Sequence, residues 1–314
     1  MNILITGGAG FIGSNLAEKL IKDHNIIVID NFNDYYSPAI KENNIKEILK
    51  NPKYKLYRAD VRDIEEIKPV FSENSIDCVV HIAASAGVRA SIKEPDLFIK
   101  NNICATVNVL ELMKDFNVKK LVFASSSSVY GNCKAEKFSE DLKITEPISP
   151  YAATKSACEQ FIYTFSKLYD IQAVCLRFFT VYGRRQRPDL AISKFVNLIK
   201  QDKPIPVYGD GTTYRDYTYI DDILSGIESA IYYNKTPYEI INLGGGEPVT
   251  LIDMIKTIEQ VLGKKAQIEW LPMQAGDVIK TSADITKAKN LLNFEPKTKF
   301  IDGIKAYVEW ANGI

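Results

Sequence analysis

The sequence predicts an α/β fold with a doubly wound parallel sheet, followed by a smaller C-terminal region. Three observations support this fold class. Short apolar segments alternate with helical segments through the first half of the chain, a glycine-rich turn follows the first of them, and polar residues gather where the apolar segments end. Buried parallel strands have such continuous apolar runs, and ligands of these sheets lie beyond the carboxyl ends of the strands.

The first strand, turn and helix form a predicted dinucleotide-binding unit of the Rossmann type. Asn2 to Thr6 is an apolar strand, and Ser14 to Lys22 predicts a helix with Leu16 and Leu20 on one face. Between them, glycines let the backbone turn and approach a pyrophosphate seated at the helix N-terminus. The expected contacts are Gly7, Gly10, Phe11, Ile12 and Gly13.

The second strand, Ile26 to Ile29, ends at Asp30, twenty residues after Gly10. A carboxylate at this point accepts hydrogen bonds from the adenosine ribose and repels a 2′-phosphate, so NAD is the predicted cofactor in preference to NADP. Asn31, beside Asp30, is expected in the same site.

Four more segments predict buried parallel strands: Lys55 to Arg58, Cys78 to Ile82, Lys120 to Ala124 and Ala173 to Arg177. Residues that follow the third, fourth and fifth strands should lie near the bound ligands at the same sheet edge. They are Asp60, Val61, Ala83, Ala84 and the serine run Ser125 to Ser128.

A tyrosine and a lysine one helical turn apart, Tyr151 and Lys155, are the predicted catalytic pair. The lysine charge is expected to favour phenolate and so bring the tyrosine pKa down from about 10. Tyr130/Lys134 and Tyr163/Lys167 have the same spacing, but Gly131 is a poor helix start and Tyr163 lies roughly 18 Å further along the helix that Tyr151 opens.

After about residue 178 the segments become shorter and richer in turn formers. Ile220 to Tyr232 predicts a helix and Glu239 to Leu243 a strand that returns to the first sheet. The expected NAD-binding domain is therefore 1–177 plus about 217–241, and the expected substrate-binding domain is 178–216 and 242–314.

Composition limits the classes of partner. Basic and acidic residues both number 39, so the chain has no net positive charge that would attract nucleic acid or an anionic membrane. No run of eighteen apolar residues and no basic leader occurs, so a cytoplasmic location is expected. The five scattered cysteines and two histidines support neither a metal site nor a disulfide framework.

Combined motifs resemble the extended short-chain dehydrogenases that act on nucleotide sugars: the glycine turn, Val129-Tyr130-Gly131 after the serines, the Tyr151/Lys155 pair, and Tyr214 to Tyr217. Segments 81–89 and 177–189 most resemble UDP-glucuronate 4-epimerases. The resemblance implies conversion of UDP-glucuronate to UDP-galacturonate through a 4-keto sugar, with NAD bound throughout. Tyr151, Lys155 and Ser126 would be catalytic, and the protein would be a homodimer.

The resemblance also implies the remaining contacts, some with open alternatives. Asn102 resembles a family asparagine near the cofactor, and the alternative is an amide on a helix surface. Arg89 is expected either to contact the sugar or to form an ion pair at a helix start. Arg187 is expected to clamp the sugar carboxylate, with Arg185 and Arg89 as alternatives. The other expected substrate contacts are Ser127, Ser128, Thr180, Tyr208, Arg215 and Asp277.

The segment 126–131 has no acid, in contrast to dehydratases and decarboxylases of the superfamily, and Glu136 and Glu140 are expected to be solvated. Epimerisation is therefore favoured. Two other hypotheses are a UDP-glucose or UDP-N-acetylglucosamine 4-epimerase and a non-catalytic NAD sensor. A sensor would not need Tyr151, Lys155 and Ser126 together.

Overall fold

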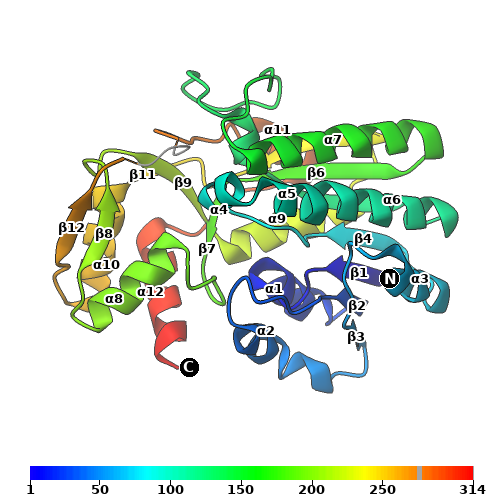
Figure 1. Ribbon diagram of the computed structural model, residues 1–314, viewed down its shortest axis with the longest axis horizontal. Coiled ribbons are helices and arrows are strands. Elements are labelled where there is room, and N and C mark those ends of the chain that lie inside the picture. The colour runs from blue at the N-terminus through cyan, green and yellow to red at the C-terminus, as the bar shows by residue number, and fades with distance from the viewer. Residues whose placement is uncertain (274–277, 314) are drawn as a thin grey trace.

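The structure, a computed structural model, describes residues 1–273 and 278–313. Its centre is a parallel sheet of seven strands in the order β10-β6-β5-β4-β1-β2-β3 (Figure 1). This order confirms the predicted doubly wound α/β class. The strands are β1 (Asn2–Thr6), β2 (Asn25–Ile29), β3 (Tyr54–Tyr57), β4 (Cys78–His81), β5 (Lys120–Ser126), β6 (Gln172–Phe178) and β10 (Tyr238–Leu243).

Helices cover both faces of the sheet because successive strand residues point to opposite sides. Ile3 and Ile5 belong to one buried cluster with α1 (Phe11–Leu20) and α9 (Ile220–Tyr232). Leu4 belongs to the other cluster, with three helices on the opposite face. These three helices are α3 (Ile64–Glu73), α6 (Ala105–Asp115) and α7 (Pro150–Tyr169).

Two helix starts depend on local sequence. The predicted start of the first helix at Ser14 was too late: α1 begins at Phe11, directly after Gly10, because the glycine turn itself supplies the cap. α7 begins with Pro150 at its first turn, and the Ser149 side chain accepts a hydrogen bond from the Ala152 N–H. Both features are typical of helix N-termini.

The chain between β4 and α6 is irregular. After the short helices α4 (Val88–Lys93) and α5 (Pro95–Phe98), residues Ile99–Cys104 form a π-helix, η2, that continues into α6. A short 3₁₀ turn, η3 (Ser127–Tyr130), follows β5. Short helices α2 (Pro38–Ile45) and η1 (Ile48–Lys50) lie between β2 and β3.

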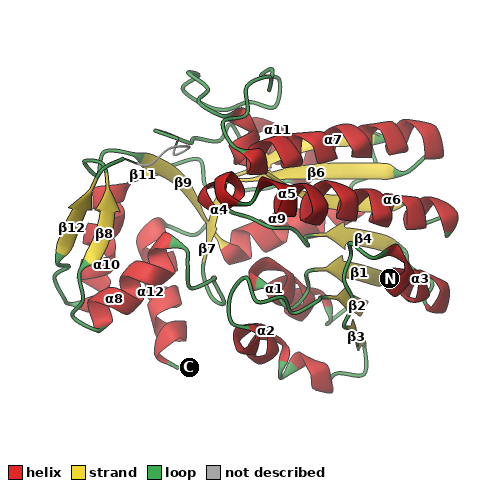
Figure 2. Ribbon diagram, viewed as in Figure 1, coloured by secondary structure: helices red, strands yellow, loops and turns green. Residues whose placement is uncertain are grey.

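A second region packs beside the carboxyl ends of the large sheet (Figure 2). It contains a sheet of β11 (Pro248–Thr250), β9 (Tyr214–Tyr219) and β7 (Thr180–Tyr182), and a pair formed by β12 (Ile268–Leu271) and β8 (Ile205–Tyr208). Its helices are α8 (Ala191–Lys200), α10 (Leu251–Leu262), α11 (Thr286–Leu292) and α12 (Phe300–Asn312).

The predicted return to the first sheet occurs: α9 packs on it, and β10 pairs in parallel with β6. The exact division into two domains stays a prediction. Within the described ranges, no helix has the length and hydrophobicity needed to cross a membrane.

Candidate active site

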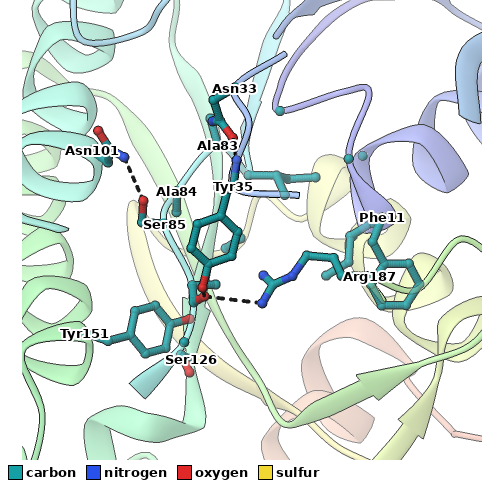
Figure 3. A pocket seen from close by; sticks show the side chains of 18 of the residues that line it. Phe11, Asn33, Tyr35, Ala83, Ala84, Ser85, Asn101, Ser126, Tyr151 and Arg187 are labelled. Atoms are coloured by element: carbon teal, nitrogen blue, oxygen red, sulfur yellow. Dashed lines mark hydrogen bonds between the residues drawn. The ribbon is translucent and has the colours of Figure 1, made fainter. Parts of the chain in front are cut away.

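A cavity of about 400 Å³ lies where the large sheet meets the second region. Figure 3 shows Tyr151, Ser126, Tyr35 and Arg187 converging on it from different segments. Its lining includes most of the predicted site residues: Gly7, Gly10, Phe11, Ile12, Gly13, Asp30, Asn31, Asp60, Val61, Ala83, Ala84, Ser126, Ser128, Tyr151, Lys155, Thr180 and Arg187.

The glycine turn has the shape that a pyrophosphate requires. A Cβ atom at Gly13 would lie 2.2 Å from the carbonyl oxygen of Gly7, and Gly7 itself has φ of +71°. Gly10 brings no side chain to the N-terminus of α1, so the N–H groups of the first turn open to the cavity. These residues therefore fit a dinucleotide phosphate at the helix N-terminus.

Asp30 is buried and held in one orientation. Its two carboxylate oxygens accept hydrogen bonds from Ala9 N (3.0 Å) and Phe32 N (2.9 Å). Lys41 Nζ, also buried, lies 3.6 Å from Asp30 Oδ1. The sequence did not indicate Lys41, because only the fold of α2 brings it to the end of β2.

Asp60 lies beside this pair and is strongly anionic. Burial opposes ionisation, but hydrogen bonds from Arg62 and Asn31 hold its pKa at about 2. Arg62 reaches both carboxylate oxygens, at 3.0 Å and 2.6 Å. Asp30 and Asp60 therefore offer two acidic groups at the end of the cavity where an adenosine ribose would lie.

Tyr151 projects into the cavity from the first turn of α7, and its ring makes a T-shaped contact with the Phe98 ring. Burial raises its pKa, and a hydrogen bond with Ser126 and the charge of Arg187 oppose that rise. The expected lowering of the tyrosine pKa by Lys155 is not found. Lys155 Nζ instead donates to the Ala124 carbonyl at 2.7 Å, and burial lowers its own pKa to about 8.

The other two Tyr/Lys pairs lie outside the cavity lining. Tyr130 is buried and donates to Asn242 Oδ1 at 2.8 Å. Tyr163 is 46% exposed on the surface of α7. Of the three tyrosines with this spacing, Tyr151 is the one that faces Ser126 in the cavity.

Asn102 lies behind the cavity wall. Its side chain accepts from Ser85 N at 2.8 Å and donates to Ser85 O and Thr154 Oγ1, both at 3.0 Å. It is buried, so the surface-amide alternative is wrong. Its neighbour Asn101 lines the cavity instead and donates to Ser85 Oγ at 2.7 Å. Because η2 is a π-helix, a count of helical positions could not distinguish the two asparagines.

Of the three arginines between 184 and 187, Arg187 lines the cavity. Arg184 pairs with Asp221 at 2.6 Å, and Arg185 pairs with Glu18 at 3.0 Å. Arg187 donates to Asp189 and to the Ala86 carbonyl. Tyr35, which the sequence did not indicate, lies beside it, with the Arg187 Cζ 5.2 Å from the ring centre.

Among the described residues, the other predicted substrate contacts lie outside this cavity lining. The Arg89 guanidinium packs over the Tyr208 ring, with 4.4 Å from its Cζ to the ring centre. Arg215 Nη1 donates to the Tyr214 carbonyl at 3.0 Å. Ser127 belongs to η3 and is not in the lining, and Asp277 lies outside the described residues.

A buried ion pair supports the serine strand from behind. Glu159, fully buried on α7, accepts from Arg177 Nε (2.9 Å) and Nη2 (2.8 Å) and from Ser125 Oγ (2.5 Å).

Glu140 is not the solvated acid that the sequence suggested. It accepts from Asn242 N at 2.7 Å, and burial raises its pKa.

Comparison with known proteins places the chain in a family. A family profile named GDP-mannose 4,6 dehydratase matches residues 4–307. The UDP-glucuronate 4-epimerase of Thermodesulfobacterium geofontis is 45% identical over 310 residues, which cover 98% of this chain and 95% of that protein. The chain belongs to this family of extended short-chain dehydrogenases.

Solved structures of extended short-chain dehydrogenases have the same fold. The UDP-glucuronic acid 4-epimerase of Bacillus cereus, in complex with UDP-glucuronic acid and NAD, is 37% identical with a TM-score of 0.94. That match covers 100% of this chain and 99% of the other. A UDP-glucose 4-epimerase of Thermotoga maritima with UDP-glucose is 32% identical with a TM-score of 0.92, again over 100% and 99% of the two chains.

Proposed function

We propose that the protein is an NAD-dependent 4-epimerase that converts UDP-glucuronate to UDP-galacturonate. The observation that carries the choice of sugar is the position of Arg187, a cation in the same cavity as Tyr151 and Ser126. A uronate carboxylate needs a charged partner once it leaves water, whereas a plain hexose does not. The T. geofontis and B. cereus relatives act on the same sugar by name, which supports this choice.

The residues of the cavity can perform the proton transfers of this reaction. Tyr151, hydrogen-bonded to Ser126, would take the proton of the sugar 4-hydroxyl and later return it. NAD, held by the glycine turn, Asp30 and Asp60, would supply the hydride chemistry at C4. Return of the hydride to C4 on the opposite face of the sugar would invert the configuration with no net redox change.

The cavity residues also divide into a cofactor end and a sugar end. The glycine turn, Asp30 and Asp60 would hold the pyrophosphate and the adenosine ribose. Ser128, Thr180 and Arg187 would hold the sugar and its carboxylate. Tyr208, Arg215 and Asp277 would hold the uridine diphosphate further out, and Arg89 would contact the sugar, although in this structure Arg89, Tyr208 and Arg215 lie outside the cavity lining.

A UDP-glucose or UDP-N-acetylglucosamine 4-epimerase is the second candidate. It would use Tyr151, Lys155 and Ser126 in the same way, and the T. maritima relative supports the same chemistry on an uncharged sugar. Arg187 distinguishes the candidates, because an uncharged hexose has no group that needs it.

We further infer a cytoplasmic homodimer. Phe161 and Leu168, seven residues apart on α7, are exposed large hydrophobic side chains, and a second copy of the same helix is the partner that would cover them. Light scattering of the purified protein tests the dimer directly, and a monomer at micromolar concentration would contradict it.

The function is tested by supplying the purified protein with UDP-glucuronate, UDP-glucose and UDP-N-acetylglucosamine in separate reactions. Inversion at C4 is followed by chromatography of the products. The proposal expects UDP-galacturonate as the favoured product. Faster inversion of either uncharged sugar would contradict the assignment of UDP-glucuronate, and no inversion of any sugar would contradict the epimerase.

A further inference from the structure

Arg187 is held by groups of the protein itself on three sides. Its Nε and Nη2 donate to the two oxygens of Asp189, at 3.0 Å and 2.8 Å. Nη2 also donates to the Ala86 carbonyl at 3.3 Å. The Tyr35 ring lies beside the guanidinium, and its hydroxyl donates to the same carbonyl at 2.9 Å (Figure 3). A planar group with these contacts has both its position and its tilt fixed.

The contact with Asp189 occupies one edge of the guanidinium. A guanidinium has five N–H groups arranged in two forks, and Asp189 takes the fork formed by Nε and Nη2. Among the described residues, Nη1 donates to no protein acceptor, so its two N–H groups are available to a ligand, whereas both N–H groups of Nη2 already have protein acceptors. Figure 3 shows the Arg187 side chain extending toward the side of the cavity where Tyr151 and Ser126 lie.

The backbone keeps Asp189 in this place. The Leu190 N–H donates to the Arg187 carbonyl at 3.2 Å, which closes a turn with Pro188 and Asp189 at its centre. Proline at this position presets the turn. Asp189 lies two residues after Arg187, and the turn keeps its carboxylate within reach of the guanidinium. The Asp189 side chain is nevertheless 47% exposed.

We propose that Asp189 is a positioning residue, which fixes the plane of the Arg187 guanidinium and thereby protects the substrate carboxylate from loss during the reaction. The inference rests on the proposed function, because only a uronate carries that carboxylate. It assigns to Asp189 control over the product formed, rather than contact with the sugar.

The chemistry explains why the plane matters. Oxidation at C4 makes a β-keto acid. If the C5–C6 bond aligns with the C4 carbonyl π system, that bond breaks, its electron pair forms the enolate across C4 and C5, and carbon dioxide leaves. Protonation of C5 by water then gives a 4-keto pentose, and return of the hydride to C4 gives a UDP-pentose with no net redox change. A guanidinium free to rotate would let the carboxylate reach this alignment.

The test compares Asp189→Ala and Asp189→Asn with the wild-type protein, and uses Asp221→Ala as a matched control. Asp221 also pairs with an arginine of the same loop, Arg184, and is exposed, but lies outside the cavity lining. The NAD content and the unfolding temperature of each variant show that it is folded and loaded. The readouts with UDP-glucuronate are the rate of inversion and the fraction of turnovers that end as UDP-pentose.

We expect both Asp189 variants to lose roughly tenfold in kcat/KM on UDP-glucuronate, as for a two-point charge-assisted contact, and to raise the UDP-pentose fraction well above that of the control. Asparagine keeps the shape of aspartate but replaces an acceptor with a donor, so it should not rescue. A purely steric role would leave Asp189→Asn like the wild type.

Two results would overturn the inference about Asp189 but leave the proposed function standing, provided that the wild-type protein inverts UDP-glucuronate. Tighter binding of UDP-glucuronate by Asp189→Ala without UDP-pentose would show that Asp189 competes with the substrate for Arg187. A product ratio equal to that of Asp221→Ala would show that Asp189 has no role. Failure of the wild-type protein to invert UDP-glucuronate would instead contradict the proposed function itself.

Discussion

The environment of Tyr151, more than its spacing from a lysine, separates it from the other two tyrosines. Tyr130 is enclosed by the core and bonded to Asn242, and Tyr163 is at the surface of α7. Tyr151 shares the cavity with Ser126, and burial raises its pKa, so the neutral phenol predominates in this structure. A proton acceptor at this position therefore depends on the hydrogen bond to Ser126 and on the nearby positive charge of Arg187.

Tyr151→Phe is expected to reduce inversion at C4 by about 10²- to 10⁴-fold, the usual contribution of a general acid or base. Binding of NAD and of the UDP-sugar should remain, because only one oxygen is removed. Steady-state rates and calorimetric binding measure the two effects separately. Tyr163→Phe on the same helix is the control, and an equally large loss there would reject Tyr151 as the catalytic tyrosine.

Arg187→Ala is expected to reduce turnover of UDP-glucuronate at least tenfold, since a buried charge-assisted contact is worth roughly 1.5 to 3 kcal/mol. Any activity on UDP-glucose should fall far less, because that sugar has no carboxylate. Arg184→Ala, which removes the loop cation paired with Asp221, should leave both rates near wild type. Equal losses on the two sugars would move the carboxylate contact to Arg185 or Arg89.

At the scale of elements, the sequence predicted the strands of the large sheet to within about two residues, because buried parallel strands are continuous apolar runs. The sequence placed the start of α1 too late, because glycine has a low helix propensity and so gives no local signal that a helix begins beside it. It could not predict η2, since a π-helix changes which side chains face inward without changing composition. Asn101, for which the sequence made no prediction, therefore lines the cavity, and the predicted Asn102 lies behind its wall.

His81 at the end of β4 joins three elements and gives a pH-dependent stability. Its ring bonds Thr6 Oγ1 on β1 at 2.7 Å and Thr106 Oγ1 on α6 at 3.1 Å. Burial, with a smaller effect of the Lys155 charge, lowers its pKa to about 3. Between about pH 6.5 and 3 the unfolded chain binds a proton that the folded chain does not, so stability is present above this window and is lost as pH falls through it.

The expected slope is at most about 1.4 kcal/mol per pH unit from this one group. Urea unfolding of wild type and His81→Gln at a fixed NAD concentration measures it, and the variant should be less stable but less sensitive to acid. His24→Gln is the control, because His24 bonds the hydroxyl of the exposed Tyr232 and burial lowers its pKa by less than that of His81, so this variant should keep most of the slope. Parallel acid curves for wild type and His81→Gln would refute the assignment.

At the scale of the whole molecule, long-range polar contacts join β6 and β10 of the large sheet to α7 and to the segment that follows β5. Arg177 bonds Glu159 and Tyr130, and Tyr130 bonds Asn242, whose amide donates to the Phe138 carbonyl at 2.7 Å. These residues are scattered through the sequence and become neighbours only in the fold. Sequence patterns predicted the glycine turn, Asp30 and Tyr151 because each lies at a marked local position, whereas Glu159, Glu140, Lys41 and Tyr35 have no local signal.

The arrangement of the molecule around its cavity leads to a last prediction, that protein purified without added cofactor retains NAD. The cavity lies between the large sheet and the second region, and a catalyst that recovers its hydride in each turnover gains nothing by releasing the cofactor. We expect close to one NAD or NADH per chain after denaturation, and turnover that does not depend on external NAD.

Gly13→Ala should abolish this retention, because its Cβ would lie 2.2 Å from the Gly7 carbonyl oxygen and would deform the turn that meets the pyrophosphate. Gly313→Ala, where the nearest atom to a Cβ is 3.7 Å away, is the matched control and should retain NAD like the wild type. The unfolding temperature of each variant separates loss of the cofactor site from loss of the fold. If wild-type protein yields no nucleotide on denaturation and turns over only with continuous external NAD, then hydride is not returned within one binding event. If NADH also accumulates in step with product, the reaction is a net oxidation rather than an epimerisation.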